Sequence, residues 1–334
     1  MIDLSKTHNL NPIANSWWIE LNSFLFDERK GTKRPYYYNR RHKKKPCKSF
    51  FQKMRAKALM GLSKKGKIIA KTILDNYKAN FNAITLADDR GLRRFAEDYR
   101  MSLRGLSISD EEKVNNRIVQ VFSELYESFV EMQGYSVLEL LSIMTCPFCN
   151  RQFVTVCKEA KVRPDFDHFL PKSKYPTLAV SFFNLVPICS TCNKTKGTRR
   201  VYIHPYFGGA KMEFYAHEKG NITKKSLADL ARLTENQLEV SISSSDIASI
   251  RSLNVLRTKP IYNTHRNYVA NIISKAYAYD RHACNALVDD FAANSGSPQD
   301  VHNFVWGPYL DRRHQEEMPL SKLTADILDE FGIK

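Results

Sequence analysis

Two Cys-x-x-Cys pairs, Cys146–Cys149 and Cys189–Cys192, limit what this chain of 334 residues can fold into more than any other feature. Cysteines at this spacing form a turn that presents two thiolates to one metal ion, and four thiolates complete the tetrahedral shell of zinc. Such a site has no open position for water or substrate, so the zinc would be structural. The sequence therefore predicts a zinc centre that ties two turns together, with a folded segment between them.

The other three cysteines, Cys47, Cys157 and Cys284, stand outside these pairs, and we expect a small, partly buried side chain at each position. Cys157 lies nearest to the pairs and is an alternative zinc ligand. The sequence does not open on a basic segment followed by an apolar one, and no apolar run is long enough to span a bilayer. These features predict a cytoplasmic protein, and a reducing compartment favours metal binding over disulfide bonds.

Lysine and arginine outnumber the acidic residues by 51 to 35, which gives a formal net charge of +16. Many of these cations lie between Arg29 and Lys48, where they are interleaved with tyrosines at 36–38 and no acidic residue occurs. Cations bind phosphates and aromatic rings stack on bases or sugars, so the segment favours contact with nucleic acid over a solvated loop or a membrane surface. The candidate contacts in this segment are Arg34, Arg40, Arg41, Lys43, Lys44 and Lys45.

The composition and residue pattern of the sequence divide the chain into three regions. Residues 1–144 and 215–334 carry apolar residues at helical spacing, whereas residues 145–214 are punctuated by glycine, proline, cysteine and asparagine. We therefore predict a mainly α protein, in which helical N- and C-terminal regions flank a small zinc module. The N-terminal region also carries the basic segment.

Helix signals are clearest between Ser109 and Gly134. Ser109 and Glu112 have the spacing of a capping box, apolar residues follow at helical spacing, and Gly134 supplies a stop signal. The polar stretch Ser241–Ser245 is expected to be a connector. Further helices are expected over 17–25, within 50–82, over 227–233, from 268 towards 293, and over 319–334.

Within the zinc module the sequence predicts two short strands and a helix. Residues 166–169 form a strand that ends before Pro171, and residues 184–188 form a return segment. Residues 190–196 then form a short helix whose first turn carries Cys192. The module is therefore expected to run strand, strand, helix around the metal.

The order of these features resembles the HNH endonuclease family. The shared pattern is Cys-x-x-Cys, then Asp-His with a proline three residues after the histidine, then Asn-Leu, then Cys-x-x-Cys-Asn-x-x-Lys-Gly. It covers about residues 145–200 and is similar to the zinc-knuckle members with the ββα-metal fold, a relative of the treble clef. The stretches from His168 to Pro176 and from Pro319 to Ile327 also resemble bacterial phage-defence nucleases of this family, including the nuclease subunit of Septu systems.

The resemblance implies roles for four residues between and beside the cysteine pairs. It makes His168 the general base that takes a proton from water, and Asp167 a ligand of Mg2+ or Mn2+. Asn193 stands where many relatives carry a final histidine and becomes a second oxygen ligand, while Asn184 orients the His168 ring or its loop. Because adjacent strand residues point to opposite faces, Asp167 and His168 can serve one site only if the strand bulges or ends there.

Three further side chains are candidates for contact with phosphate or metal. Lys194 and Lys196 either bind the phosphate backbone of nucleic acid or simply solvate the short helix. His204, in the sequence His-Pro-Tyr-Phe, is a candidate metal or phosphate contact, although a packed turn residue is the favoured interpretation.

We therefore expect a metal-dependent endonuclease that hydrolyses phosphodiester bonds in DNA as part of anti-phage defence, with structural Zn2+ and catalytic Mg2+ or Mn2+. A non-catalytic zinc-module adaptor that binds nucleic acid, and the same chemistry acting on RNA, are the alternatives. One module holds one base and one catalytic metal and nicks one strand, so a double-strand break needs two copies or two events. A homodimer or a partner that presents the substrate is therefore expected. The resemblance to defence nucleases also implies a co-encoded ATPase subunit as a partner.

Overall fold

The computed structural model describes residues 2–6, 8–27, 36–38, 44–46, 48–279, 286–287, 289–290, 297–307 and 314–333. The described chain is mainly helical, as the sequence predicts, and its strands form two-stranded sheets. It divides into two compact units, each assembled from separate parts of the chain. We call His8–Ser142 with Val156–Pro187 the helical unit, and Met1–Thr7 with Ile143–Thr155 and Ile188–Lys334 the cysteine unit. The three-region division stays a prediction, and residues 145–214 contribute to both units.

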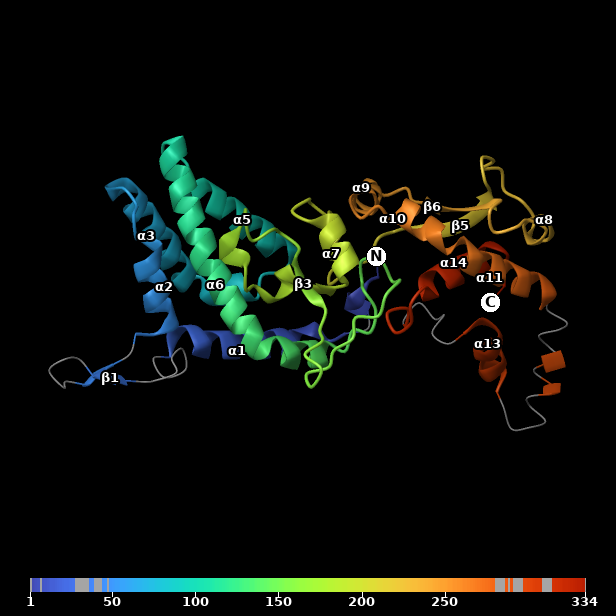
Figure 1. Cartoon of the computed structure of the whole chain (residues 1–334), viewed down its shortest axis with the longest axis horizontal. Helices are drawn as coiled ribbons and strands as arrows, with labels where there is room; N and C mark the ends of the chain where they lie inside the picture. The colour runs from blue at the N-terminus through green and yellow to red at the C-terminus, as the bar shows by residue number, and fades with distance from the viewer. Residues whose placement is uncertain are drawn as a thin grey trace. The chain divides into compact units, whose positions relative to one another are not determined.

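The helical unit is built around a long helix, α6. Helices α1, α2 and α3 pack against α6, and Figure 1 shows α2 and α3 beside it. The β1 backbone pairs antiparallel with β2, and Tyr37 lies opposite Lys45. The elements are α1 (Leu10–Phe26), β1 (Tyr36–Tyr38), β2 (Lys44–Pro46), α2 (Phe50–Ala58), α3 (Lys64–Ala79), α4 (Phe81–Thr85), α5 (Asp89–Ser102), α6 (Ile108–Leu141), β3 (Asp165–His168), η2 (Pro176–Leu178), η3 (Phe182–Asn184) and β4 (Leu185–Ile188), whose last residue belongs to the cysteine unit.

The N-terminus of α6 lies earlier than the sequence predicts. Its N-cap is Ser107, not Ser109, and the Ser107 hydroxyl accepts a hydrogen bond from Asp110 N at 3.2 Å. Both serines stand three residues before an acidic residue, so the local pattern does not choose between them. The sequence identified the helix correctly and its first residue incorrectly.

The prediction that Gly134 ends this helix is also wrong, because α6 continues to Leu141. A Cβ at Gly134 would lie 3.1 Å from Val130 Cγ1 and 3.6 Å from Phe166 of β3. The Phe166 distance is an ordinary van der Waals contact, and the tight neighbour is Val130 of α6 itself. A glycine inside a helix is tolerated, so a local helix-stop rule places the end of this helix too early.

Residues 156–187 carry β3 and most of β4 and pack against the helices of the helical unit. Trp17 of α1 lies at the centre of this packing: its Nε1 donates to Val180 O at 2.9 Å. The Trp17 ring stands edge-on to Phe129 of α6 with centroids 4.7 Å apart, and it lies 6.5 Å from Phe166 of β3. This buried aromatic core fixes the segment that carries the predicted catalytic residues.

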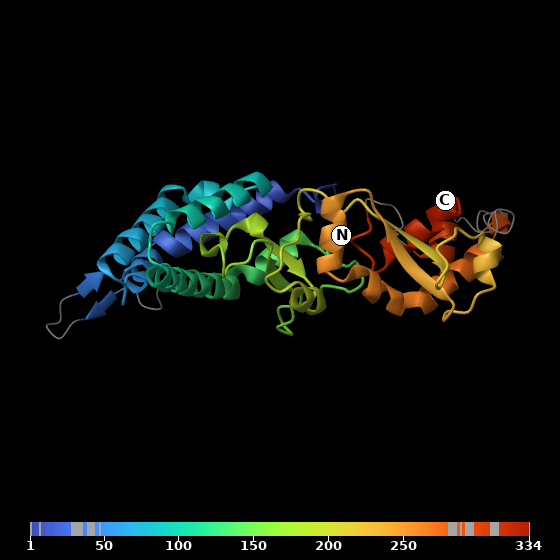
Figure 2. The same ribbon diagram turned by 90° about the horizontal axis from the view of Figure 1, so that it is seen from above.

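The cysteine unit contains a strand pair that the sequence analysis missed. Strand β5 pairs antiparallel with β6, with Phe214 opposite Ile242, and Figure 2 shows the two strands side by side next to helices of the unit. Ser241 and Ser243 therefore belong to β6 and not to a connector, which corrects the prediction for Ser241–Ser245. The elements are η1 (Leu4–Lys6), α7 (Ser190–Lys196), β5 (Glu213–Glu218), α8 (Leu227–Ala231), β6 (Leu238–Ser243), α9 (Ile247–Val255), α10 (Thr258–Tyr262), η4 (Asn263–His265), α11 (Arg266–Ala278), α13 (Pro298–Trp306) and α14 (Ser321–Glu330).

Most other helix predictions are confirmed in the described residues. Helix α1 contains the predicted stretch 17–25, and α14 occupies most of 319–334. The helix expected from residue 268 is α11, which ends at Ala278, and much of the chain from 280 to 293 lies outside the described residues. No helix in the described part of the chain is long and apolar enough to cross a bilayer.

Candidate functional site

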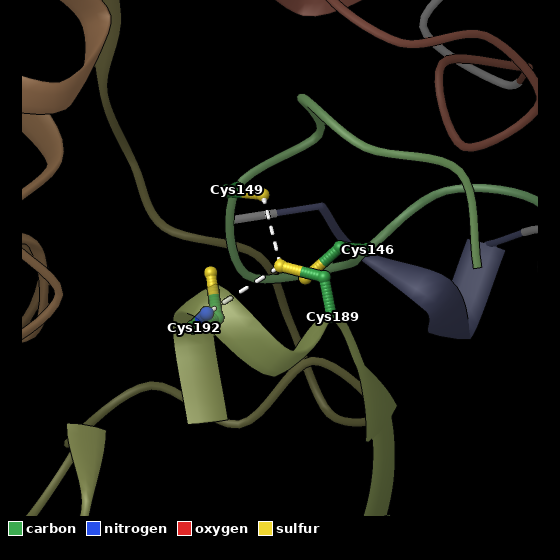
Figure 3. Close-up of side chains that lie close together, drawn as sticks. All are labelled: Cys146, Cys149, Cys189 and Cys192. Carbon is green, nitrogen blue, oxygen red and sulfur yellow. Dashed lines mark hydrogen bonds between the residues drawn. The ribbon is translucent and has the colours of Figure 1, made fainter. Parts of the chain in front are cut away.

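Four cysteine side chains meet inside the cysteine unit (Figure 3). Their sulfur atoms all lie within 4.8 Å of one another, and all four residues are buried. Cys146 and Cys149 come from one turn, Cys189 follows β4, and Cys192 lies on α7. The predicted four-cysteine cluster is therefore confirmed, and Cys157 lies outside it.

Hydrogen bonds shape both cysteine turns. Cys146 N donates to Gln152 O at 2.9 Å, and Asn150 N donates to Cys146 O at 2.7 Å, which closes the first turn. In the second pair, the Cys189 sulfur accepts from Cys192 N at 3.4 Å and caps the N-terminus of α7. The local backbone therefore brings the thiols of each pair towards one point, as Figure 3 shows.

The geometry and chemistry of the cluster fit a zinc ion. Cys149 Sγ and Cys189 Sγ lie 3.9 Å apart, close to the separation of about 3.8 Å between two thiolates on tetrahedral zinc with bonds of about 2.3 Å. Burial raises the pKa of the Cys146 thiol well above its usual range, whereas hydrogen bonds from the other cysteines, Cys146 first, lower the pKa of Cys149. A divalent ion resolves this conflict because it favours the thiolate form of every ligand. The cluster is therefore consistent with structural zinc.

The sequence analysis missed Asn150, which directly follows the first cysteine pair. Its φ is 48°, in the left-handed region that asparagine tolerates better than most residues. Its buried side chain donates from Nδ2 to Gln315 O at 2.7 Å and to Met318 O at 3.2 Å, and its Oδ1 accepts from Lys322 N at 3.1 Å. Asn150 therefore ties the first cysteine turn to the start of α14. The available sequence signal was an asparagine immediately after a Cys-x-x-Cys pair.

His168 is the last residue of β3, in the helical unit, and its side chain is half-buried. Its Nε2 lies 2.9 Å from Ala179 O. A carbonyl oxygen only accepts hydrogen bonds, so Nε2 carries the proton and Nδ1 is the proton-accepting nitrogen of the neutral ring. Tyr126 of α6 packs edge-on against the ring, with centroids 4.7 Å apart. These contacts fix both the orientation and the tautomer of the imidazole.

Asn184 is completely buried and closes the loop that follows β3. Its Oδ1 accepts from Leu170 N at 2.8 Å, and its Nδ2 donates to Leu170 O at 3.1 Å and to Leu178 O at 2.9 Å. The backbone adds a further bond, from Phe169 N to Asn184 O at 2.9 Å. The resemblance left open whether Asn184 holds the ring or the loop, and these bonds are all with the loop that begins after His168.

The two predicted ligands of a catalytic cation belong to different units. Asp167 precedes His168 in β3 and is buried. The strand ends at His168, which is one of the conditions under which these neighbouring residues can serve one site. Asn193 lies on α7 in the cysteine unit and is half-buried. A cation site that contains both Asp167 and Asn193 therefore stays a prediction from the resemblance.

Helix α6 contributes a residue to the surroundings of His168 that the sequence analysis missed. The ring of Tyr126 meets the imidazole at its edge, and Lys172 Nζ lies 4.4 Å from the centroid of the same ring. Burial raises the pKa of Tyr126 to about 12, so its hydroxyl stays protonated at neutral pH. No local motif marks Tyr126, because only the packing of α6 against the later segment brings it to His168.

The remaining predicted contacts differ in their exposure. Lys194 is exposed on α7 whereas Lys196 is 1% exposed, so Lys194 is the more suitable of the two for contact with phosphate. His204 is buried, and its Nδ1 accepts from Tyr206 N at 3.2 Å, as a packed turn residue does. The side chains of the basic segment lie outside the described residues, as do two cysteines; these residues are Arg34, Arg40, Arg41, Lys43, Lys44, Lys45, Cys47 and Cys284.

The chain has distant, partial similarity to a known protein. Over 93 residues it is 32% identical to Septu protein PtuB of Bacillus thuringiensis. The match covers 27% of this chain and 33% of that protein, so the chain spans a third of the relative's length. No family model matches the chain, and no solved structure matches it. The comparisons therefore support a distant relationship to a Septu protein over part of the chain.

Proposed function

We propose that this protein is a metal-dependent HNH endonuclease that hydrolyses phosphodiester bonds in DNA. The observation that carries the proposal is the hydrogen bond from His168 Nε2 to Ala179 O, which makes Nδ1 the basic nitrogen. The orientation of a histidine in one tautomer, at the end of a strand that lies between two cysteine pairs, suits a general base. A zinc-module adaptor that only binds nucleic acid has no use for this arrangement.

In the proposed reaction His168 accepts a proton from the attacking water at Nδ1. The Ala179 carbonyl then stabilises the imidazolium, because its oxygen faces the Nε2–H group. Asn184 holds Leu178, the residue directly before Ala179, and also Leu170, which lies shortly after His168. One buried amide therefore fixes both the base and the carbonyl that supports it, which preserves their alignment with the phosphate.

Asp167 is the proposed carboxylate ligand for Mg2+ or Mn2+, and Asn193 remains the second ligand that the resemblance implies. A hard divalent ion bound there would neutralise charge on the phosphate and on the departing 3′ oxygen, which leaves 5′-phosphate and 3′-hydroxyl products. The burial of Asp167 supports this role, because an ionised carboxylate is stable in the interior only with hydrogen bonds or a cation beside it. The four-cysteine cluster is proposed to hold Zn2+ as a structural ion only.

The charge of the chain and the partial similarity support the proposed substrate and setting. A formal net charge of +16 favours a polyanionic substrate through counterion release. The similarity to Septu protein PtuB supports a role in bacterial anti-phage defence. A co-encoded ATPase subunit is the partner that the sequence resemblance implies. One module cuts one strand, so double-strand breaks would require a homodimer or two separate events.

Plasmid nicking in the presence of Mg2+ or Mn2+ tests the proposal. We expect His168→Ala to lower the cleavage rate by at least about 100-fold, as the loss of a general base does. His314→Ala is the matched control, because His314 is an exposed histidine of the cysteine unit. Equal cleavage by wild type and His168→Ala would remove His168 from the mechanism and with it the proposal.

The same preparation separates the alternatives. Binding of DNA without cleavage under any divalent ion would indicate a zinc-module adaptor. Cleavage of RNA with plasmid left intact would keep the chemistry and change the substrate. His168→Ala and His314→Ala are compared with each substrate. A contaminating nuclease would cleave equally in both preparations, so cleavage that depends on His168 belongs to this protein.

A further inference from the structure

Lys172 is a partly dehydrated cation near His168 that has no assigned role. It lies in the loop that Asn184 closes and is half-buried. Its Nζ lies over the face of Tyr126, 4.4 Å from the ring centroid. Within the described part of the chain, Lys172 forms no ion pair with a carboxylate. Its ammonium therefore lies against an aromatic face and makes no direct ion pair with a described carboxylate.

Tyr126 connects this cation to the proposed base. The rings of Tyr126 and His168 pack in an edge-to-face arrangement with centroids 4.7 Å apart. Both distances end at the Tyr126 centroid, so Lys172 Nζ lies no more than 9.1 Å, the sum of the two, from the His168 centroid. Phosphates follow one another at roughly 3.4 Å of helix axis along a strand, so the two groups reach phosphates no more than about three nucleotides apart.

We propose that Lys172 is a phosphate-binding residue that positions the nucleic-acid backbone beside His168, and that Tyr126 is the positioning residue that holds both side chains. This inference rests on the proposed function. A lysine ammonium is a compact charge that suits a single phosphate oxygen. The face of Tyr126 restricts the ammonium before nucleic acid binds, so less side-chain freedom is lost on binding.

The surroundings of Lys172 agree with this role. Burial lowers the pKa of Lys172, and Glu127 acts in the opposite direction. A cation that has already lost part of its water shell gives up less hydration when a phosphate oxygen arrives. The Tyr126 hydroxyl is not needed, because both described contacts involve the ring.

Binding of a short fluorescein-labelled DNA duplex, followed by anisotropy, tests the inference. The protein is the full chain with His168→Ala, so that cleavage does not interfere. Lys172→Met removes the charge and keeps an apolar stem over the ring, while Lys172→Arg keeps the charge. Lys174→Met is the matched control, since Lys174 is an exposed lysine in the same loop.

Loss of one phosphate contact has a defined signature. We expect Lys172→Met to raise Kd about eightfold at 0.1 M salt and to reduce the slope of log K against log salt by about 0.9. Lys172→Arg and Lys174→Met should leave both quantities close to those of the parent. A lysine that only packs on Tyr126 would change thermal stability and leave Kd and the salt slope unchanged, which would overturn the inference.

Cleavage kinetics in the chain with His168 intact give a second readout. Lys172→Met should raise KM and change kcat by less than about threefold, because the contact is made equally in the ground and transition states. Tyr126→Phe should behave as wild type, whereas Tyr126→Leu should raise KM and lower kcat about tenfold as the imidazole loses its edge contact.

The two proposals fail in different ways. Full cleavage by His168→Ala would overturn the proposed function. The DNA-binding comparison of Lys172→Met with Lys174→Met would still test whether Lys172 contacts phosphate. Equal losses of affinity in Lys172→Met and Lys174→Met would overturn the assignment of Lys172 alone, whereas failure of the chain to bind DNA would overturn both proposals. If Lys172→Met does not fold, Lys172→Gln provides the neutral variant, and the salt slope remains the deciding measurement.

Discussion

Asn150 and Asn184 are both buried asparagines that hold a loop, but they reach across very different lengths of chain. Asn184 binds Leu170 and Leu178, within its own segment of the helical unit. Asn150 binds backbone groups between residues 315 and 322, at the far end of the cysteine unit. The loop after β3 is therefore closed by its neighbours, whereas the first cysteine turn depends on the start of α14.

The two loops also differ in what supports them besides an asparagine. The cysteine turn ends in a cluster of four sulfurs that fits zinc, while the loop after β3 packs in the aromatic core around Trp17. Bound metal should therefore determine how well ordered the first cysteine turn is and have little effect on the loop after β3. The expected effects of removing each support differ accordingly.

Removal of the zinc ligands should have the largest effect. We expect the double variant Cys149→Ser with Cys189→Ser to lose its zinc and several kcal/mol of stability, because structural zinc contributes roughly 10–16 kcal/mol in isolated zinc-finger peptides. Elemental analysis measures the zinc, and amide exchange locates the loss, which should be concentrated in 143–155 and 188–196. Cys157→Ser is the control and should retain zinc. If the double variant lost as much protection from amide exchange in the loop after β3 as in the cysteine turns, the expected difference between the two loops would be wrong.

Asn150→Ala should come next. It leaves several buried backbone groups without their amide partner and places an alanine at a φ of 48°, at a total cost of about 3–4 kcal/mol. Asn150→Gly separates the two contributions, because glycine accepts the backbone conformation and lacks the amide. Chemical unfolding of the cysteine unit gives the magnitude, and nearly full stability in Asn150→Gly would show that the backbone conformation and not the amide matters.

Asn184→Ala should cost somewhat less, about 2–3 kcal/mol, because its amide makes three bonds to two residues. Its effect on cleavage should exceed that of Asn150→Ala and reach at least about tenfold, since the loop carries the carbonyl that fixes His168. Amide exchange at 169–179 and plasmid nicking measure the two effects. Unchanged nicking with a disordered loop would separate Asn184 from the proposed reaction.

Tyr262→Phe should have the smallest effect. The buried Tyr262 hydroxyl donates to Cys149 O, so its removal leaves one carbonyl of the cysteine turn without this donor. We expect a loss of about 1 kcal/mol with zinc fully retained. A large loss of zinc would show that the turn depends on Tyr262 more than on Asn150.

The sequence predicted the elements that short-range patterns define. The two cysteine pairs and the helix at 190–196 lie where their spacing and flanking residues indicate, and the strand predicted over 166–169 is present as β3, one residue earlier in the chain. The role of Asn184 in closing the loop was one of two alternatives that the resemblance offered. These features depend on residues that are close together in the chain.

Features that depend on distant partners escaped prediction. Gly134 resembles a helix stop, yet α6 continues past it to Leu141 and packs near Phe166 of β3 there, which no local window contains. The polar serines of β6 resemble a connector until β5 supplies its hydrogen bonds. Tyr126 shows no motif, because it reaches His168 only through the packing of α6.

The division of the cysteine unit among three segments has a consequence for how the protein is made. A ribosome releases the chain from the N-terminus, so the helical unit is complete once Pro187 has emerged. The four sulfurs are available five residues later, whereas the groups that Asn150 binds follow only near residue 315. We therefore expect the nascent chain to bind its metal well before α14 is synthesised and its hydrogen bonds with Asn150 stabilise the first cysteine turn.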